Sequence, residues 1–312
     1  AKVSNNIYSF TIPYTGKESL KIALANPKSS SFPAKKLTKI GGEFPSWNDE
    51  SNTIHWSLGS SFFSYNLRDS EKFDDEMEEK KKEEEKKKEE DKDEEEDKDE
   101  EEDKDEEEFL ADELEVIVEL NRDIPESSIL LKNAKIITMN EDEIIENGQI
   151  YIVNNRIKEV SENQINIDES TEVIDLNGKT ILPGFVDTHA HMRPSWGLQK
   201  NQPFSYAANL AYGVTTTRDP QTGTTDVLTY SDMVDTGKIL GPRVYSTGPG
   251  VGYWGYNFKS LDEAKDALKQ YSKYYNTKTI KMYRAGNRQQ RQWILMAAKE
   301  QNIMPTTEGA LD

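Results

Sequence analysis

The sequence contains no cysteine among its 312 residues. This absence excludes a disulfide framework and any metal site built from thiolates. The sequence also lacks an apolar run long enough to span a bilayer, so we expect no membrane span. No signal peptide is visible. Because the chain starts at Ala1 and ends at Asp312 within or just after strand-like sequence, we expect it to be a piece of a longer protein.

Histidine is scarce, and two of the three histidines lie close together. His189 and His191 follow an apolar run and a Pro183-Gly184 turn. In a strand, side chains at i and i+2 point to the same face, so the two imidazoles are expected side by side. Neutral imidazole suits Zn²⁺, and the pair therefore indicates a metal site. The alternative is a pair of buried or surface histidines without a metal. The third, His55, has no candidate ligands nearby and is interpreted as a sheet residue.

The formal net charge is −19, but it is concentrated in one segment. Residues 71–108 contain 26 acidic residues and 10 lysines, which leaves −3 for the rest of the chain. This segment has too few apolar residues to fold by burial, and we expect a disordered insertion with a transient helix over 76–90. An acidic tail for cations or basic partners is the alternative. With no basic stripe or stacking platform, we expect no nucleic-acid partner.

Outside residues 71–108, the sequence up to residue 182 predicts β-structure. Residues 1–70 contain short strands, among them a hairpin of 41–47 and 53–57 around a polar turn. Further strands are expected over 114–120, 129–131 and 134–139. Asn154-Asn155 and Asn177-Gly178 each lie between two strand-like runs and predict β-hairpins. A small β-sandwich is therefore expected before the two histidines.

From residue 183 onward, strands and helices alternate. Strands are expected to start at Phe185, Val214, Arg243, Thr279 and Ile303, with helices over 204–212, 226–235, 260–275 and 288–301. The strand starts are 29, 29, 36 and 24 residues apart, the spacing of βα units in a parallel sheet or a (β/α)₈ barrel. Residues 181–312 are about half of the ~250 that a closed barrel needs. The predicted fold class is mixed: β-sheet units, among them a small β-sandwich, followed by an incomplete (β/α)₈ barrel.

Three motifs in this region resemble the amidohydrolase superfamily. The run I-L-P-G-F-V-D-T-H-A-H-M (181–192) resembles its first barrel strand, and G-V-T-T-T-R-D (213–219) and G-P-R-V-Y-S-T-G (241–248) resemble the second and third. The barrel is most similar to imidazolonepropionase and prolidase-like enzymes, and P-S-W-N-D-E-S (45–51) resembles a Tol-type propeller blade. The expected domains are the last propeller blade (1–70), the acidic insertion (71–108), a β-strand unit (109–182) and half a barrel (183–312).

The resemblance implies one or two divalent ions, most simply zinc, held by His189 and His191. Lys281 lies where many members carry a carboxylated lysine that bridges two metals; an outward, solvated lysine or a carboxylate-paired one is the alternative. Glu308 stands near the place of the usual fifth-strand histidine, so it is either a metal ligand or a structural carboxylate. By position, Arg218 and Tyr253 are expected to contact substrate; the alternatives are an ion pair for Arg218 and a place on the barrel rim for Tyr253. Asp187 is either structural or orients a histidine ring.

The implied activity is metal-dependent hydrolysis of carbon–nitrogen bonds other than linear peptide bonds, through a metal-activated water and on a small amide or cyclic amide. Family members take their general base from the last barrel strand, so we expect residues 1–312 alone to be inactive. One alternative is a prolidase-like dipeptidase. Another is a degenerate barrel whose propeller binds a protein partner. The resemblance slightly favours a periplasmic or secreted location.

Overall fold

A computed structural model describes residues 1–3, 5–14, 16, 22, 24, 27–90, 107–192, 199–251, 258–283 and 285–307. These residues belong to two compact units, one formed by Ala1–Val118 with Val251–Asp312 and the other by Glu119–Gly250. The four-segment division expected from the sequence stays a prediction. Within the described ranges, no helix has the length and apolar character needed to cross a bilayer.

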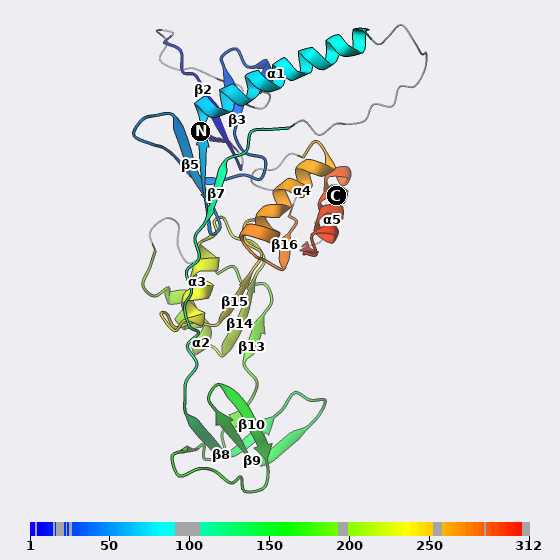
Figure 1. The fold of residues 1–312 in the computed structure, drawn as a ribbon. Helices are drawn as coiled ribbons and strands as arrows, with labels where there is room; N and C mark the ends of the chain where they lie inside the picture. The colour runs from blue at the N-terminus through cyan, green and yellow to red at the C-terminus, as the bar shows by residue number, and fades with distance from the viewer. Residues whose placement is uncertain are drawn as a thin grey trace. The chain divides into compact units, whose positions relative to one another are not determined.

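Two antiparallel sheets form the β-structure of the amino-terminal part of the first unit (Figure 1). The first contains β1 (Lys2–Val3), β2 (Asn6–Phe10) and β3 (Ala34–Lys36), and a short 3₁₀ helix, η1 (Pro27–Ser29), precedes β3. The second contains β4 (Glu43–Trp47), β5 (Thr53–Leu58), β6 (Ser61–Asn66) and β7 (Asp112–Glu115), in that order. The predicted β4–β5 hairpin is confirmed, and Asn48 Oδ1 closes its turn by accepting from the backbone N–H groups of Asn52 and Thr53. The propeller blade stays a prediction.

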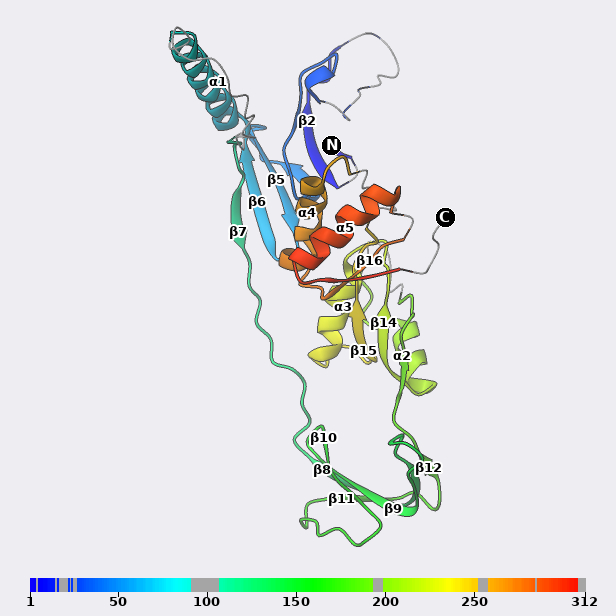
Figure 2. The same ribbon diagram turned by 90° about the vertical axis from the view of Figure 1, so that its right-hand side faces the viewer.

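The acidic segment begins as a regular helix. Residues 71–90, expected to be disordered apart from a transient helix, belong to α1 (Leu67–Glu90). Its first turns are held by contacts that local sequence cannot reveal: Lys35 bonds to Ser70 and Asp74, and the ring of Phe73 contacts Phe109. Beyond these turns the helix extends away from the sheet (Figure 2), where its pairing is between its own charges. Residues 91–106 lie outside the described residues.

In the second unit, the region expected to form a small β-sandwich forms one five-stranded sheet in the described part of the chain. Its strands are β8 (Ser128–Ile137), β9 (Ile144–Val153), β10 (Arg156–Ser161), β11 (Glu172–Asp175) and β12 (Thr180–Ile181). The β9–β10 hairpin is confirmed, with Asn154 at a positive φ of 57°. The two short strands predicted over 129–139 are one strand, because β8 continues through a bulge at Asn133.

The hairpin predicted at Asn177-Gly178 is wrong. β11 and β12 do not pair with each other; both pair in parallel with β8, one after the other along its edge. The backbone N–H of Leu176 donates to Lys132 O, and that of Gly178 donates to Asn133 O. The turn at Asn177-Gly178 therefore bonds to the bulge of β8, and the chain continues as β12 along the same edge of β8.

The predicted βα alternation is confirmed. The second unit contains β13 (Phe185–Asp187), α2 (Phe204–Ala211), β14 (Val214–Asp219), α3 (Asp226–Asp235) and β15 (Arg243–Ser246). The first unit contains α4 (Leu261–Lys269), a π-helical turn η3 (Gln270–Tyr274), β16 (Thr279–Lys281), α5 (Arg288–Glu300) and β17 (Met304–Thr306). All strand pairs among them are parallel, as β13-β14-β15 and β16-β17. These mixed sheets and helices fit a partial barrel, and the described strands form no closed sheet.

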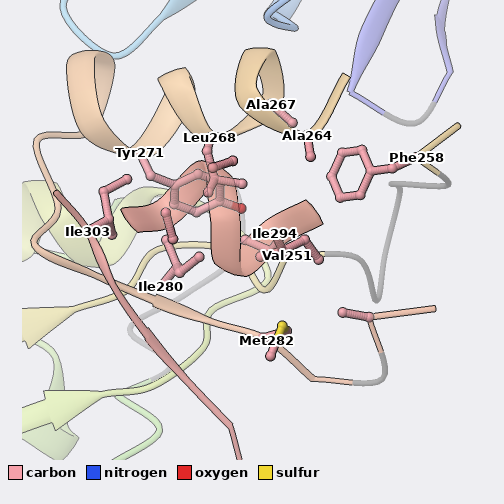
Figure 3. Close-up of a cluster of buried hydrophobic side chains, with 13 residues drawn as sticks. Val251, Phe258, Ala264, Ala267, Leu268, Tyr271, Ile280, Met282, Ile294 and Ile303 are labelled. Carbon is pink, nitrogen blue, oxygen red and sulfur yellow. The ribbon is translucent and has the colours of Figure 1, made fainter. Parts of the chain in front are cut away.

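An apolar core holds the βα elements of the first unit together. Leu268 of α4 and Tyr271 of η3 pack toward Ile280 of β16 and Ile294 of α5 (Figure 3). All four side chains are fully buried. Burial of such side chains stabilises the unit by roughly 1.5–3 kcal/mol each, which explains why the short strands β16 and β17 persist.

Candidate metal-binding site at the carboxyl end of β14

The two clustered histidines follow strand β13 and do not belong to it. β13 ends at Asp187, and Thr188 and His189 form a turn. The expectation that both rings project from one face of a strand is therefore wrong. The strand ends because Asp187 Oδ1 accepts a hydrogen bond from the backbone N–H of His189 (2.9 Å), which turns the chain. The contact that Asp187 makes is thus with the backbone of His189, and a role in orienting a ring stays a prediction.

The turn nevertheless brings the two imidazoles together. Their ring centroids lie 5.2 Å apart at an interplanar angle of 74°, and both side chains are exposed. Between them, the backbone N–H of the buried Ala190 donates to Arg218 O (3.0 Å), which keeps the segment alongside β14. The rings are therefore adjacent and accessible to a dissolved ion.

A buried carboxylate fixes the segment that carries the histidines. Asp219, the last residue of β14, is fully buried. Its Oδ2 accepts from the backbone N–H of Met192 (2.8 Å), and its Oδ1 accepts from that of Gln221 (3.1 Å). Hydrogen bonds to a charged acceptor contribute roughly 1.5–3 kcal/mol each. The end of β14 thus anchors both the histidine segment and the loop that follows β14.

The environment of His191 selects which of its nitrogens can bind a metal. Nδ1 lies 3.2 Å from Gln221 O and 3.9 Å from Asp219 Oδ1. A carbonyl oxygen can only accept, so Nδ1 carries the hydrogen and Nε2 keeps a free lone pair. Metal-binding histidines commonly donate their second nitrogen to a carbonyl or a carboxylate in this way. The arrangement therefore fits a ligand whose ring is already oriented.

A buried tyrosine lies near this carboxylate. Tyr206 of α2 is fully buried, and its ring contacts that of Tyr230 at 6.0 Å. Burial raises the pKa of Tyr206, and the charge of Asp219 raises it further, so the phenol stays neutral. Its hydroxyl has no hydrogen-bond partner among the residues that the structure describes. No local sequence pattern indicates that Tyr206 lies near Asp219, because α2 and β14 are brought together only by the fold.

The donor set at this site consists of two imidazole nitrogens. Among the described residues, no group of three or more His, Cys, Asp or Glu side chains is arranged to hold a metal ion. Two histidine nitrogens fit half of the four-coordinate shell that zinc prefers. The pair therefore suits a zinc ion that takes its other ligands from water or from residues outside this cluster.

Of the other predicted site residues, the structure describes Lys281 and Arg218. Lys281 ends β16 in the first unit and is only 2% exposed, so the solvated alternative for it is wrong. Its ammonium lies 5.9 Å from the ring centroid of Tyr283. Arg218 is half-buried beside the site, and its substrate role stays a prediction. Glu308 and Tyr253 lie outside the described residues.

Comparison with known proteins gives short or partial similarities. No protein-family model matches the chain. Over 62 residues the chain is 50% identical to 5-methylthioadenosine/S-adenosylhomocysteine deaminase from Bacillus thuringiensis, a match covering 19% of this chain and 14% of the deaminase. The chain is thus similar to about a seventh of that protein's length.

Two solved structures are similar over a longer stretch. One is a Xaa-Pro dipeptidase with bound methionine in its active site, with a TM-score of 0.47 and 20% identity. The other is an amidohydrolase, with a TM-score of 0.48 and 19% identity. Each match covers 58% of this chain and 56% of the other. The proteins to which this chain is similar in part are thus a deaminase, a dipeptidase and an amidohydrolase.

Proposed function

We propose that this chain carries the metal-binding part of a hydrolase that acts on carbon–nitrogen bonds other than linear peptide bonds. The observation that carries the proposal is the geometry of His189 and His191. Their rings are adjacent, and Nδ1 of His191 faces Gln221 O and the Asp219 carboxylate. This geometry supports a divalent ion, most simply zinc, held by the two imidazoles. The substrate class that we propose is a small amide or cyclic amide.

The chain's own residues would prepare the site before any ion arrives. Asp219 fixes the backbone at Met192, and the Ala190–Arg218 bond fixes the backbone between the histidines. These contacts reduce the conformational freedom that metal binding would otherwise have to restrict. When bound, a zinc ion lowers the pKa of its water from ~15.7 to ~7 and so supplies hydroxide near neutral pH. Lys281, as a carboxylated ligand, and Glu308 are proposed as further ligands.

A second candidate is a scaffold without catalysis. It is favoured by one observation: within the described ranges, the two histidines have no third His, Cys, Asp or Glu positioned to share a metal ion with them. On that reading, the barrel elements are structural and the amino-terminal sheets bind a protein partner. The two candidates differ in metal affinity, since a scaffold has no need of an ion.

Metal content tests the proposal. The protein is incubated with zinc, dialysed and measured by elemental mass spectrometry, together with a His189→Ala/His191→Ala double variant. We expect about one equivalent of zinc in the wild type and none in the double variant, because two nitrogen donors are lost. His55→Ala is the matched control. His55 lies in β5, where its ring stacks on Phe62 and Nδ1 bonds to Ser64, so this variant should keep its zinc.

Two results would overturn the proposal. A folded wild type that retains no zinc would leave the scaffold as the better account. Zinc retained by the double variant but lost from His55→Ala would place the ion elsewhere.

A further inference from the structure

The second unit contains a cavity beside β14 and β15, and neither histidine of the candidate metal site belongs to its lining. Its volume is about 510 Å³, and Thr216, Arg243 and Tyr245 contribute to its lining. Thr216 is paired with Arg243 near the amino ends of these parallel strands, whereas Asp219 is the carboxyl-terminal residue of β14. Tyr245 is paired with Arg218, next to Asp219, but neither Asp219 nor the two histidines belong to the lining. The lining of the cavity is therefore distinct from the candidate metal site.

Three arginines converge on this cavity. Arg122, Arg156 and Arg243 all line it, and Asp235 is the one acidic side chain among the lining residues. Arg122 is paired with Asp235 at 3.1 Å. In the described part of the chain, the guanidinium groups of Arg156 and Arg243 have neither an ion pair nor a hydrogen bond. The lining therefore carries an excess of two positive charges.

The positively charged lining of this cavity favours an anion with several acceptor oxygens. Each guanidinium presents several N–H donors in a planar fork that matches the oxygens of a phosphate or a carboxylate. Like charges that share one cavity repel each other, and an anion between them removes that cost. The hydroxyl groups of Thr216 and Tyr245 add neutral donors to the same lining. The best match is a compact anion with two negative charges and several acceptor oxygens.

We propose that this cavity binds a phosphate group, either as inorganic phosphate or as a small phosphate monoester. A phosphate dianion balances the excess charge of the lining, and its oxygens can accept from two arginines at once. The volume leaves room for a small organic substituent on one oxygen. The proposal does not depend on the metal site, since neither the histidines nor Asp219 line the cavity.

Calorimetric titration with inorganic phosphate and with methyl phosphate tests the proposal. The titrations are carried out slightly above neutral pH, at constant ionic strength set with chloride. We expect both ligands to bind the wild type, with Arg156→Gln and Arg243→Gln each weakening the affinity about threefold to tenfold, the range expected for an exposed charged contact. A preference for one ligand identifies the source of the phosphate group.

Two further variants separate a specific site from general charge. Arg68→Gln removes an exposed arginine in the first turn of α1, in the other unit, and should leave the affinity unchanged. Asp235→Asn removes the competing carboxylate and frees Arg122, so it should strengthen binding. Asp235 is the last residue of α3, where a negative charge is unfavourable for the helix, so this change should not harm folding.

Two results would overturn the proposal. One is the absence of phosphate binding to a folded wild type. The other is an affinity that falls equally in Arg68→Gln and Arg243→Gln, which would show attraction to overall charge alone. Zinc content measured on the same samples should be unchanged in every variant, so failure of this site and failure of the metal site can be told apart.

Discussion

Asp219 accepts a hydrogen bond from the backbone N–H of Met192 at 2.8 Å, while its other oxygen lies 3.9 Å from Nδ1 of His191. One buried carboxylate at the end of β14 therefore accepts a hydrogen bond from the backbone of the histidine segment and also lies close to the ring of His191. This contact links residues 27 positions apart. It makes Asp219 a positioning residue for the candidate ligands, and its removal should affect both stability and metal affinity.

The variant Asp219→Asn should reduce both the stability of the protein and its affinity for zinc. The amide keeps one acceptor oxygen, so one of the two backbone N–H groups that Asp219 now satisfies loses its partner. We expect the free energy of unfolding to fall by about 1–3 kcal/mol and zinc affinity to fall about tenfold. Urea unfolding and competition with a chelator measure these effects. Asp142→Asn, at an exposed loop carboxylate, is the control. Unchanged zinc affinity in Asp219→Asn would contradict the positioning role.

Tyr206→Phe should not destabilise the protein. The Tyr206 hydroxyl is buried without a hydrogen-bond partner in the described part of the chain, so its removal should leave stability unchanged or raise it by about 1 kcal/mol. Tyr230→Phe is the matched comparison, because the Tyr230 hydroxyl accepts from the backbone N–H of Lys200 at 2.6 Å. That variant should lose about 1 kcal/mol. Equal losses in both variants, measured by urea unfolding, would show that Tyr206 has a polar partner.

Glu113 should make the first unit sensitive to acid. Burial opposes its charge, but hydrogen bonds from Ser61, Lys273 and Tyr274 outweigh this effect and lower the pKa of Glu113 below its usual 4.5. A carboxylate whose pKa is lowered by folding stabilises the folded state above pH 4.5. This stabilisation is lost as the pH falls through the pKa of the folded state. Because the pair with Lys273 is partly exposed, the contribution is about 0.5 kcal/mol.

The variant Glu113→Gln tests this pH dependence. Its deficit in unfolding free energy relative to wild type should be constant near neutral pH and should shrink below pH 4.5. Glu115→Gln, two residues along the same strand, should show no such trend. A deficit that grew on acidification would reverse the sign that we assign to the Glu113 interactions.

Gly178→Ala should strain the turn between β11 and β12. Gly178 has a φ of 78°, which disfavours any residue with a Cβ, although the space around it is open. We expect a loss of about 1 kcal/mol, arising from the backbone alone. Asn177→Gly, at a φ of 49°, should be nearly neutral. Thermal unfolding of the two variants side by side checks the difference; equal stabilities would argue against a positive φ at position 178.

Local patterns predicted the elements of the βα region well. The helix expected over 226–235 is found with these bounds, and the five expected strands lie within one residue of their predicted starts. Helical periodicity and β-branched runs are properties of adjacent residues, so the sequence can report them directly. Asn154 likewise specified its own turn, and the strands on either side of it, β9 and β10, pair with each other.

Partners distant in sequence were harder to predict. The pair Asn177-Gly178 specifies positive φ angles, but it does not specify which strand β11 and β12 will pair with. Both strands pair with the edge of β8. At the candidate site, the adjacency of the two histidines was predicted, but the end of β13 before them was not. Asp187 ends that strand, and Asp219, which holds the segment, contacts it only after β14 has folded beside it.

X-ray absorption at the zinc edge tests the central claim, that His189 and His191 bind one ion together. In the zinc-loaded wild type we predict two imidazole ligands at about 2.0–2.1 Å. The variants His189→Ala and His191→Ala should each lose one imidazole from the spectrum, while His55→Ala should match the wild type. A zinc shell made only of oxygen, or one unchanged in both single variants, would contradict the account.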